Sequence, residues 1–178
     1  MHILFILLVV FLLSVVFIYS SGFGMGNLDR RTVSDFDLKR YMGDWYEIAR
    51  IDHPFERGLV EVRANYTLVD QTHIEVINSG LNPRTGERKV AHGRGVVTSM
   101  AGQLRLSFSR FFSADYNVLA VGEGYEWALV GSRSPSYLWI LSRTPHLAPS
   151  VLTHILQLAI ARGYKSEKIL LVDQAVEA

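Results

Sequence analysis

The sequence predicts an all-β protein, an eight-stranded antiparallel up-and-down β-barrel with one C-terminal α-helix and an apolar helix at the N-terminus. Three observations lead to this fold class. Apolar residues recur with a period of two from Trp45 onward, turn-forming residues separate short strands at regular spacing, and one segment with helical periodicity lies near the end. A closed barrel suits such a chain because it leaves no free strand edge and can enclose one small ligand.

Each strand is expected from the alternation of apolar and polar residues. Val62, Ala64 and Tyr66 alternate with charged or polar neighbours, which predicts a strand with one buried face. The turn residues Asn82-Pro83 and Ser134-Pro135 are among those that separate successive strands. The first strand opens near Trp45. The same pattern predicts further strands at 60–68, 74–76, 88–98, 104–108, 115–122, 125–132 and 137–143.

A single helix is expected after the last barrel strand. Pro149 fits its first position and Gly163 follows its last turn. One face would carry four apolar residues, Val151, Leu152, Ile155 and Ala159. The residue before the helix, Ala148, is a poor N-cap. A last short strand is predicted at 167–172.

The N-terminus differs from the rest of the chain. Residues 3–19 are almost unbroken apolar, and as a helix they would span roughly 26 Å, at the short end for a bilayer crossing. A cleaved signal peptide and an uncleaved membrane anchor both fit this segment. Arg30 and Arg31, which follow it, are typical of a cytoplasmic flank, so the membrane and its side stay open. We divide the chain into a signal peptide or anchor (1–22), a linker (23–34), a barrel with its C-terminal helix (35–173) and a tail (174–178).

Composition excludes several classes of function. The chain has 18 basic and 17 acidic residues, so it has no basic excess for nucleic-acid binding. It has no cysteine, which removes disulfides, thiolate metal sites and catalytic thiols. Its six histidines form no metal-binding motif. We therefore expect no metal and no cofactor.

Five blocks of sequence point to a family when they are read in order. The first is Gly43-x-Trp45-Tyr46-Glu47-Ile48-Ala49, the second is residues 55–59, and the others cover 64–68, 125–131 and 137–145. Together they resemble the lipocalins, and in particular the bacterial outer-membrane lipocalins, which are similar to apolipoprotein D and the plant temperature-induced lipocalins. The likeness covers roughly residues 35–172.

The resemblance implies a structural signature at one end of the barrel. In lipocalins the tryptophan of the opening block closes that end, and a basic residue from the last strand packs across it. Here these residues are Trp45 and Arg143, and such a contact contributes about 0.5–2 kcal/mol. The signature positions are Gly43, Trp45, Tyr46, Glu47, Tyr125 and Arg143.

The ligand is expected at the other, open end. Alternation within each strand selects residues that face the interior, and they predict an apolar cavity with tyrosine hydroxyls near one rim. The candidates are Val62, Ala64, Tyr66, Leu106, Phe108, Tyr116, Val118, Tyr137 and Trp139. The loop between the first two strands would cover this end, with Phe55 either as a lid or as a plug packed against the rim. Arg50, His53, Arg57 or Arg110 could meet a carboxylate or phosphate at the mouth.

The resemblance implies a protein that binds, stores or transports a fatty acid or lysophospholipid, and not an enzyme. Two alternatives remain: an enzyme that acts on a lipid in the same barrel through Glu47 or Asp115, and a tetrapyrrole-binding lipocalin. An integral outer-membrane barrel is disfavoured because charged residues such as Glu61 and Arg63 occupy the outer face.

We expect export to the cell envelope, as a periplasmic or membrane-associated protein. Lipoprotein relatives are anchored through a cysteine, but Phe23 stands where that cysteine belongs, so no acyl anchor can form there. The expected partners are an acyl-chain lipid and a membrane, reached through the N-terminal segment or as the source of lipid. A homodimer is left open.

Overall fold

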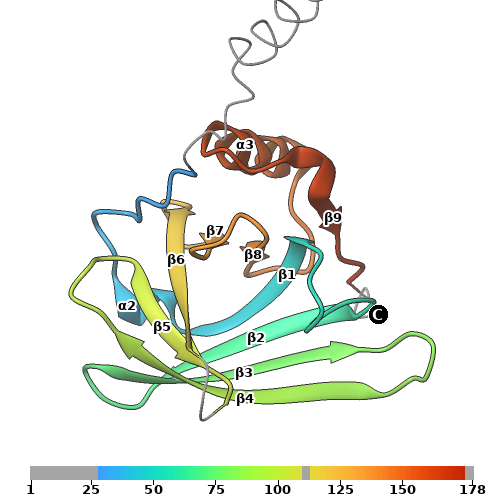
Figure 1. Cartoon of the computed structure of the whole chain (residues 1–178), viewed down its shortest axis with the longest axis horizontal. Coiled ribbons are helices and arrows are strands. Elements are labelled where there is room, and N and C mark those ends of the chain that lie inside the picture. The colour runs from blue at the N-terminus through green and yellow to red at the C-terminus, as the bar shows by residue number, and fades with distance from the viewer. Residues whose placement is uncertain (1–27, 110–112, 175–178) are drawn as a thin grey trace, which may run out of the picture.

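The computed structural model of the protein describes residues 28–109 and 113–174. Its strands close into an antiparallel barrel, because β1 pairs with both β8 and β2. Figure 1 shows the barrel with the C-terminal helix beside it. The strands are β1 (Gly43–Ile51), β2 (Val60–Leu68), β3 (His73–Leu81), β4 (Arg88–Val97), β5 (Gln103–Ser107), β6 (Ser113–Val121), β7 (Trp127–Gly131), β8 (Leu138–Ser142) and β9 (Ile169–Leu171).

The predicted barrel is confirmed, with small shifts at strand ends. β3 is longer than the predicted 74–76, because Asn78 to Leu81 continue to pair with β4. β7 begins at Trp127 and not at residue 125, because Tyr125 has a positive φ of 62° and belongs to the preceding turn. The predicted N-terminal apolar helix lies outside the described residues. No helix within 28–109 or 113–174 is long and apolar enough to cross a membrane.

A short helix precedes the barrel and was not predicted. α2 (Leu38–Tyr41) begins after Asp37, whose carboxylate accepts hydrogen bonds from the backbone amides of Lys39 and Arg40. Its last residue, Tyr41, is fully buried. Four residues are too few to show a helical period, so the sequence alone gave no signal for this element. Its effect is to carry an aromatic side chain into the closed end of the barrel.

The predicted C-terminal helix is confirmed as α3 (Pro149–Ala161). Ile155 and Ala159 are its fully buried residues, and they pack on the outside of the barrel against Leu129 and Ile140. Ala148 makes no side-chain capping hydrogen bond, as expected. A 3-10 turn, η1 (Ser166–Lys168), then leads into β9.

Alternate residues of the strands under α3 serve two separate cores. Val118 and Val130 point into the barrel, whereas Leu119 and Leu129 point outward to α3. This double burial explains why the apolar run at 116–121 shows no clear period of two in the sequence.

The first strand positions the candidate site. From Gly43 to Tyr46, β1 pairs with β2, but from Ala49 to Ile51 it pairs with β9. A β-bulge interrupts its pairing with β8, so that Glu47 lies opposite Leu141 and Arg50 lies opposite Trp139. The extra residue sends the side chains of Glu47 and Arg50 to the same, inner side of the strand.

Candidate ligand-binding site

The closed end of the barrel is built on Trp45 and Arg143. The Arg143 guanidinium carbon lies 3.7 Å from the centre of the Trp45 ring. Its nitrogens donate to the backbone carbonyls of Arg40, Met42, Asp44 and Tyr125. The Trp45 indole N–H donates to the Tyr41 carbonyl at 2.8 Å. The contact that the resemblance implied between these two residues is therefore present.

The other signature positions surround this pair. Gly43 adopts a positive φ of 94°, which favours glycine. The Tyr125 hydroxyl accepts from the Asp37 amide at 2.7 Å, and the Arg40 guanidinium lies over the Tyr125 ring. Tyr46 points outward, where Arg63 covers its ring at 4.6 Å.

Three tyrosines form a hydrogen-bonded cluster in the interior above the closed end. The hydroxyls of Tyr41 and Tyr116 are 2.6 Å apart, and the Tyr66 hydroxyl donates to that of Tyr116 at 2.9 Å. Burial raises the pKa of all three phenols above the ordinary value. We predicted tyrosine hydroxyls near a rim, and for Tyr66 and Tyr116 this was wrong. Both rings point into the barrel, and Tyr41, which we did not predict, supplies a buried partner.

A buried ion pair lies next along the interior, toward the open end. The Arg50 Nη1 donates to the Glu47 carboxylate at 2.7 Å, and both side chains are almost fully buried. The Arg50 Nη2 donates to the carbonyls of Glu56 and Leu59. Arg50 thus ties the β1–β2 loop to the barrel wall. We had placed Arg50 at the mouth, which was wrong because the bulge in β1 turns it inward.

The β1–β2 loop inserts one side chain, that of His53, into the open end of the barrel. The His53 side chain is 4% exposed, and its ring lies 5.4 Å from the rings of both Tyr137 and Trp139. Its Nε2 is 3.0 Å from a carboxylate oxygen of Glu56, which also accepts from the Trp139 indole N–H at 3.1 Å. The two groups are within ion-pair distance, but their geometry is not that of an aligned hydrogen bond.

The two carboxyl groups of this cluster have opposite pKa shifts. Burial, together with the nearby Glu56, raises the pKa of Glu47 well above its ordinary value despite Arg50. Burial also acts to raise the pKa of Glu56. There, however, the contacts from His53 and Trp139 outweigh burial and hold the pKa below its ordinary value. Of these two carboxyl groups, Glu47 therefore binds a proton more readily than Glu56 does.

Most of the residues predicted to line the cavity lie in the barrel interior or pack against it. Ala64, Tyr66, Leu106, Tyr116 and Val118 belong to the interior cluster. Val62 lies closer to the open end, in a small cluster with Leu59 and Val172. Trp139 packs against the interior cluster. The Tyr137 ring stacks on the Trp139 ring, with the ring centres 6.0 Å apart.

Phe108 occupies a different position from these buried residues. Its side chain is 44% exposed, and its ring lies so close to Gly93 that an added Cβ would be 2.6 Å away. Gly93 is buried and pairs with the buried Val76 on β3. Phe108 is thus a partly exposed apolar side chain that leans over the inner face of β4 toward the open end.

Phe55 is not a plug packed against the rim. Its side chain is 78% exposed, although its ring still lies 6.0 Å from that of His53. The plug is His53, a residue that we had suggested only as a contact for an anionic group. Arg57 is exposed and pairs with Asp52 at 2.7 Å, and Arg110 lies outside the described residues.

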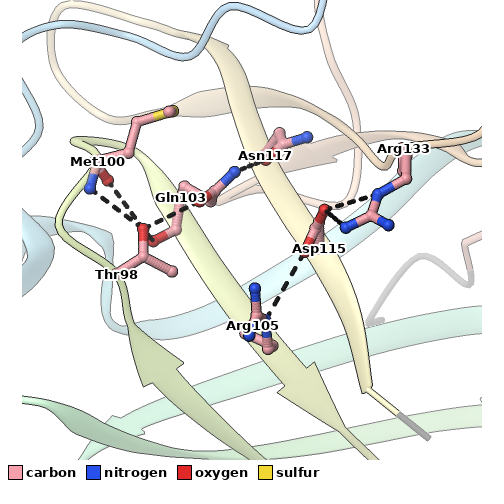
Figure 2. Close-up of polar contacts among 7 residues, drawn as sticks. All are labelled: Thr98, Met100, Gln103, Arg105, Asp115, Asn117 and Arg133. Carbon is pink, nitrogen blue, oxygen red and sulfur yellow. Dashed lines mark hydrogen bonds and ion pairs between the residues drawn. The ribbon is translucent and has the colours of Figure 1, made fainter.

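The two carboxylates of the enzyme alternative lie on opposite faces of the barrel wall. Asp115 lies on the outer face of the barrel, where Arg133 binds it at 2.9 Å and Arg105 approaches within 3.8 Å (Figure 2). The same face carries a polar chain in which Gln103 donates to Asn117 and Thr98 donates to Gln103 (Figure 2). Glu47 does face inward, but Arg50 already engages it. Within the described residues, no group of three His, Cys, Asp or Glu side chains could hold a metal ion.

A polar hollow of about 420 Å³ lies outside the barrel at its closed end. Asp35, Asp37, Arg40 and Glu123 are among its lining residues. Its charged walls do not suit an acyl chain, so the barrel interior remains the candidate site.

The chain is similar in sequence to a known protein family and to several of its members. The family described as "Lipocalin-like domain" matches residues 36–174. The outer membrane lipoprotein Blc of Escherichia coli is 43% identical over 144 residues, which cover 80% of this chain and 81% of that protein. Apolipoprotein D of Mus musculus is 34% identical over 153 residues, which cover 79% and 78%.

Solved structures show the same fold. Insecticyanin from the tobacco hornworm Manduca sexta superposes with a TM-score of 0.69 at 22% identity, covering 83% of this chain and 85% of that one. Lobster apocrustacyanin A1 gives a TM-score of 0.66 at 18% identity, covering 79% and 81%. The architecture is a closed eight-stranded antiparallel barrel with a C-terminal helix. The chain belongs to the lipocalin family, and its relatives place it with the bacterial lipocalins that are similar to apolipoprotein D. Members of this family are generally binding proteins and not enzymes.

Proposed function

We propose that this protein binds and carries a small hydrophobic ligand with an acyl chain, a fatty acid or a lysophospholipid, inside its barrel. The observation that supports this most is the asymmetry of the interior. Trp45 and Arg143 seal one end, whereas the β1–β2 loop covers the other end and inserts the His53 side chain into it. The apolar wall between them carries Leu106, Val118 and Ala64.

The energetics suit an acyl chain. Each buried methylene contributes roughly 0.8 kcal/mol, so ten of them contribute about 8 kcal/mol before the cost of ordering the ligand. Entry requires the β1–β2 loop to move, because His53 fills the space beside Trp139. The two carboxylates of the enzyme alternative are held by arginines, which supports a carrier and not a catalyst.

The test is native mass spectrometry, with extraction of lipid, on the chain from residue 25 onward. One acyl lipid per barrel is the expected result. Protein that is isolated empty, and that also fails to bind fatty acid or lysophospholipid in a titration, would contradict the proposal. Hydrolysis of the lysophospholipid by pure protein would favour the enzyme alternative instead.

We also propose that the protein works in the cell envelope, attached to or supplied by a membrane. The similarity to outer membrane lipoproteins supports the compartment. The means of attachment must differ, because this chain has no cysteine to acylate. Fractionation of cells that express the full chain, with N-terminal sequencing of the product, tests whether residues 1–22 are removed or stay in the membrane. Light scattering of the same product tests the homodimer.

A further inference from the structure

His53 occupies a small compartment that is built like a receptor for a cation. The rings of Tyr137 and Trp139 are 6.0 Å apart with an interplanar angle of 23°, and the His53 ring is 5.4 Å from each. The Glu56 carboxylate completes the compartment at 3.0 Å from His53 Nε2. Aromatic faces combined with a carboxylate are the surroundings that proteins use to bind ammonium groups.

The imidazole fits this compartment imperfectly. Both ring nitrogens of His53 are buried: Nε2 lies 3.0 Å from the Glu56 carboxylate without an aligned hydrogen bond, and Nδ1 has no hydrogen-bond partner. A buried polar atom without a partner lowers stability, so its presence calls for an explanation. By contrast, the Glu56 carboxylate is held in place by the Trp139 indole N–H. The carboxylate that lines the compartment is therefore held by a hydrogen bond, whereas the His53 ring that fills the compartment is not.

The charges of the interior also favour a cation over an anion at this point. Arg50 is the buried arginine of the described residues, and its two terminal nitrogens already donate to Glu47, Glu56 and Leu59. It offers a ligand carboxylate only its Nε. An ammonium group, in contrast, would find the carboxylate of Glu56 and the rings of Tyr137 and Trp139.

We propose that Tyr137, Trp139 and Glu56 form a subsite for an organic ammonium group, and that the His53 side chain fills this subsite when no ligand is bound. The proposal rests on the proposed function, because the ammonium group would be the polar end of an amphiphile whose chain enters the barrel. His53 would turn out toward solvent beside the exposed Phe55 as the ligand enters. The subsite makes the protein selective for amphiphiles that carry a quaternary or primary ammonium.

The test compares three amphiphiles of equal chain length: dodecyltrimethylammonium, dodecanoate and dodecanol. Each is titrated into the full chain at neutral pH, the two ionic compounds below their micelle concentrations and dodecanol below its solubility limit, and binding is followed by calorimetry and by NMR of the Trp139 indole N–H. We expect the ammonium compound to bind at least about tenfold more tightly than the other two, a difference that cation–π contacts and a shielded carboxylate can supply. Its binding should also shift the Trp139 indole resonance.

Variants separate the subsite from general packing. Glu56→Gln should weaken binding of the ammonium compound by about tenfold and change dodecanol binding by less than twofold. His53→Ala should strengthen binding of the ammonium compound, because it removes the competitor. Glu87→Gln, at an exposed position in the β3–β4 loop, is the matched control and should change neither. Thermal unfolding shows whether Glu56→Gln is folded. If it is not, Tyr137→Leu is used in its place, with the same expected loss of selectivity for the ammonium compound.

The outcomes are distinguishable. Equal binding of the three amphiphiles, unchanged in these variants, would overturn the subsite and leave the carrier function standing. Preference for dodecanoate would likewise overturn it. Failure of all three to bind would count against the carrier function itself.

Discussion

The central carbon of the Arg143 guanidinium lies 3.7 Å from the centre of the Trp45 ring, while its nitrogens donate to four backbone carbonyls. One side chain therefore ties the segment before β1, the start of β1 and the β6–β7 turn to the end of β8. This contact closes one end of the barrel.

We expect Arg143→Ala to lower the free energy of unfolding by about 2–4 kcal/mol, because it removes a cation–π contact and leaves carbonyls without a donor. Urea denaturation measures this change. Arg105→Ala is the control, since Arg105 is an exposed arginine whose nearest carboxylate is 3.8 Å away, and it should cost about 0–1 kcal/mol. An equal loss in the two variants would show that Arg143 is an ordinary surface residue.

The raised pKa of Glu47 predicts a pH dependence of stability. Its ordinary value is 4.5, and its value in the folded protein is higher. The folded state therefore favours the protonated form, and this contribution is complete below about pH 4.5 and is lost as pH rises through the folded pKa. The unfolding free energy of the wild type, minus that of Glu47→Gln, should fall as pH rises from about 4.5.

Denaturation at several pH values checks this prediction. Glu75→Gln, a change of the same chemistry at an exposed position on β3, is the control for the substitution itself. A difference between wild type and Glu47→Gln that rises with pH would show that Arg50 dominates over burial.

Two glycines of β4 should tolerate alanine to different degrees. A Cβ at Gly95 would lie 2.5 Å from Ile74 and 2.7 Å from Leu106, which are both buried. The three atoms nearest to a Cβ at Gly93 would all belong to the ring of Phe108, which is partly exposed and can turn away. We expect Gly95→Ala to destabilise the protein by about 1–3 kcal/mol and Gly93→Ala by clearly less. Thermal unfolding of both variants measures the difference, and the reverse order would contradict the packing described here.

Phe108→Ala should weaken acyl-ligand binding while it leaves the fold intact. The ring is 44% exposed at the open end, so its loss removes apolar contact with a ligand more than with the core. Burial of part of a phenyl ring supplies about 1–1.5 kcal/mol, which corresponds to roughly a fivefold to tenfold loss of affinity. Titration with a fatty acid measures it. Val96→Ala, an exposed apolar residue on the outer face of β4, is the control and should bind normally.

Much of the barrel could be predicted because its signals are local. Alternation within β2 and β5 assigned Ala64 and Leu106 to the interior without any knowledge of their neighbours, whereas Trp139 was assigned from the position that the family resemblance implied for Arg143. The turn residues set the strand limits to within a few positions. The signals failed where a feature depended on a distant partner. Tyr41 follows a polar segment, and only its contact with Trp45 and Tyr116 shows that it is core.

The sequence by itself determined the class of this protein: the period of two, the turns and the ordered motifs specify an eight-stranded lipocalin barrel, since each is a property of neighbouring residues. The tertiary structure decided what fills the barrel. The bulge in β1 depends on its pairing with β8, and it turns Glu47 and Arg50 to the same side. The burial of His53 depends on Tyr137 and Trp139, more than eighty residues away. Loops are placed by such long-range contacts, which leave no periodic trace in the chain.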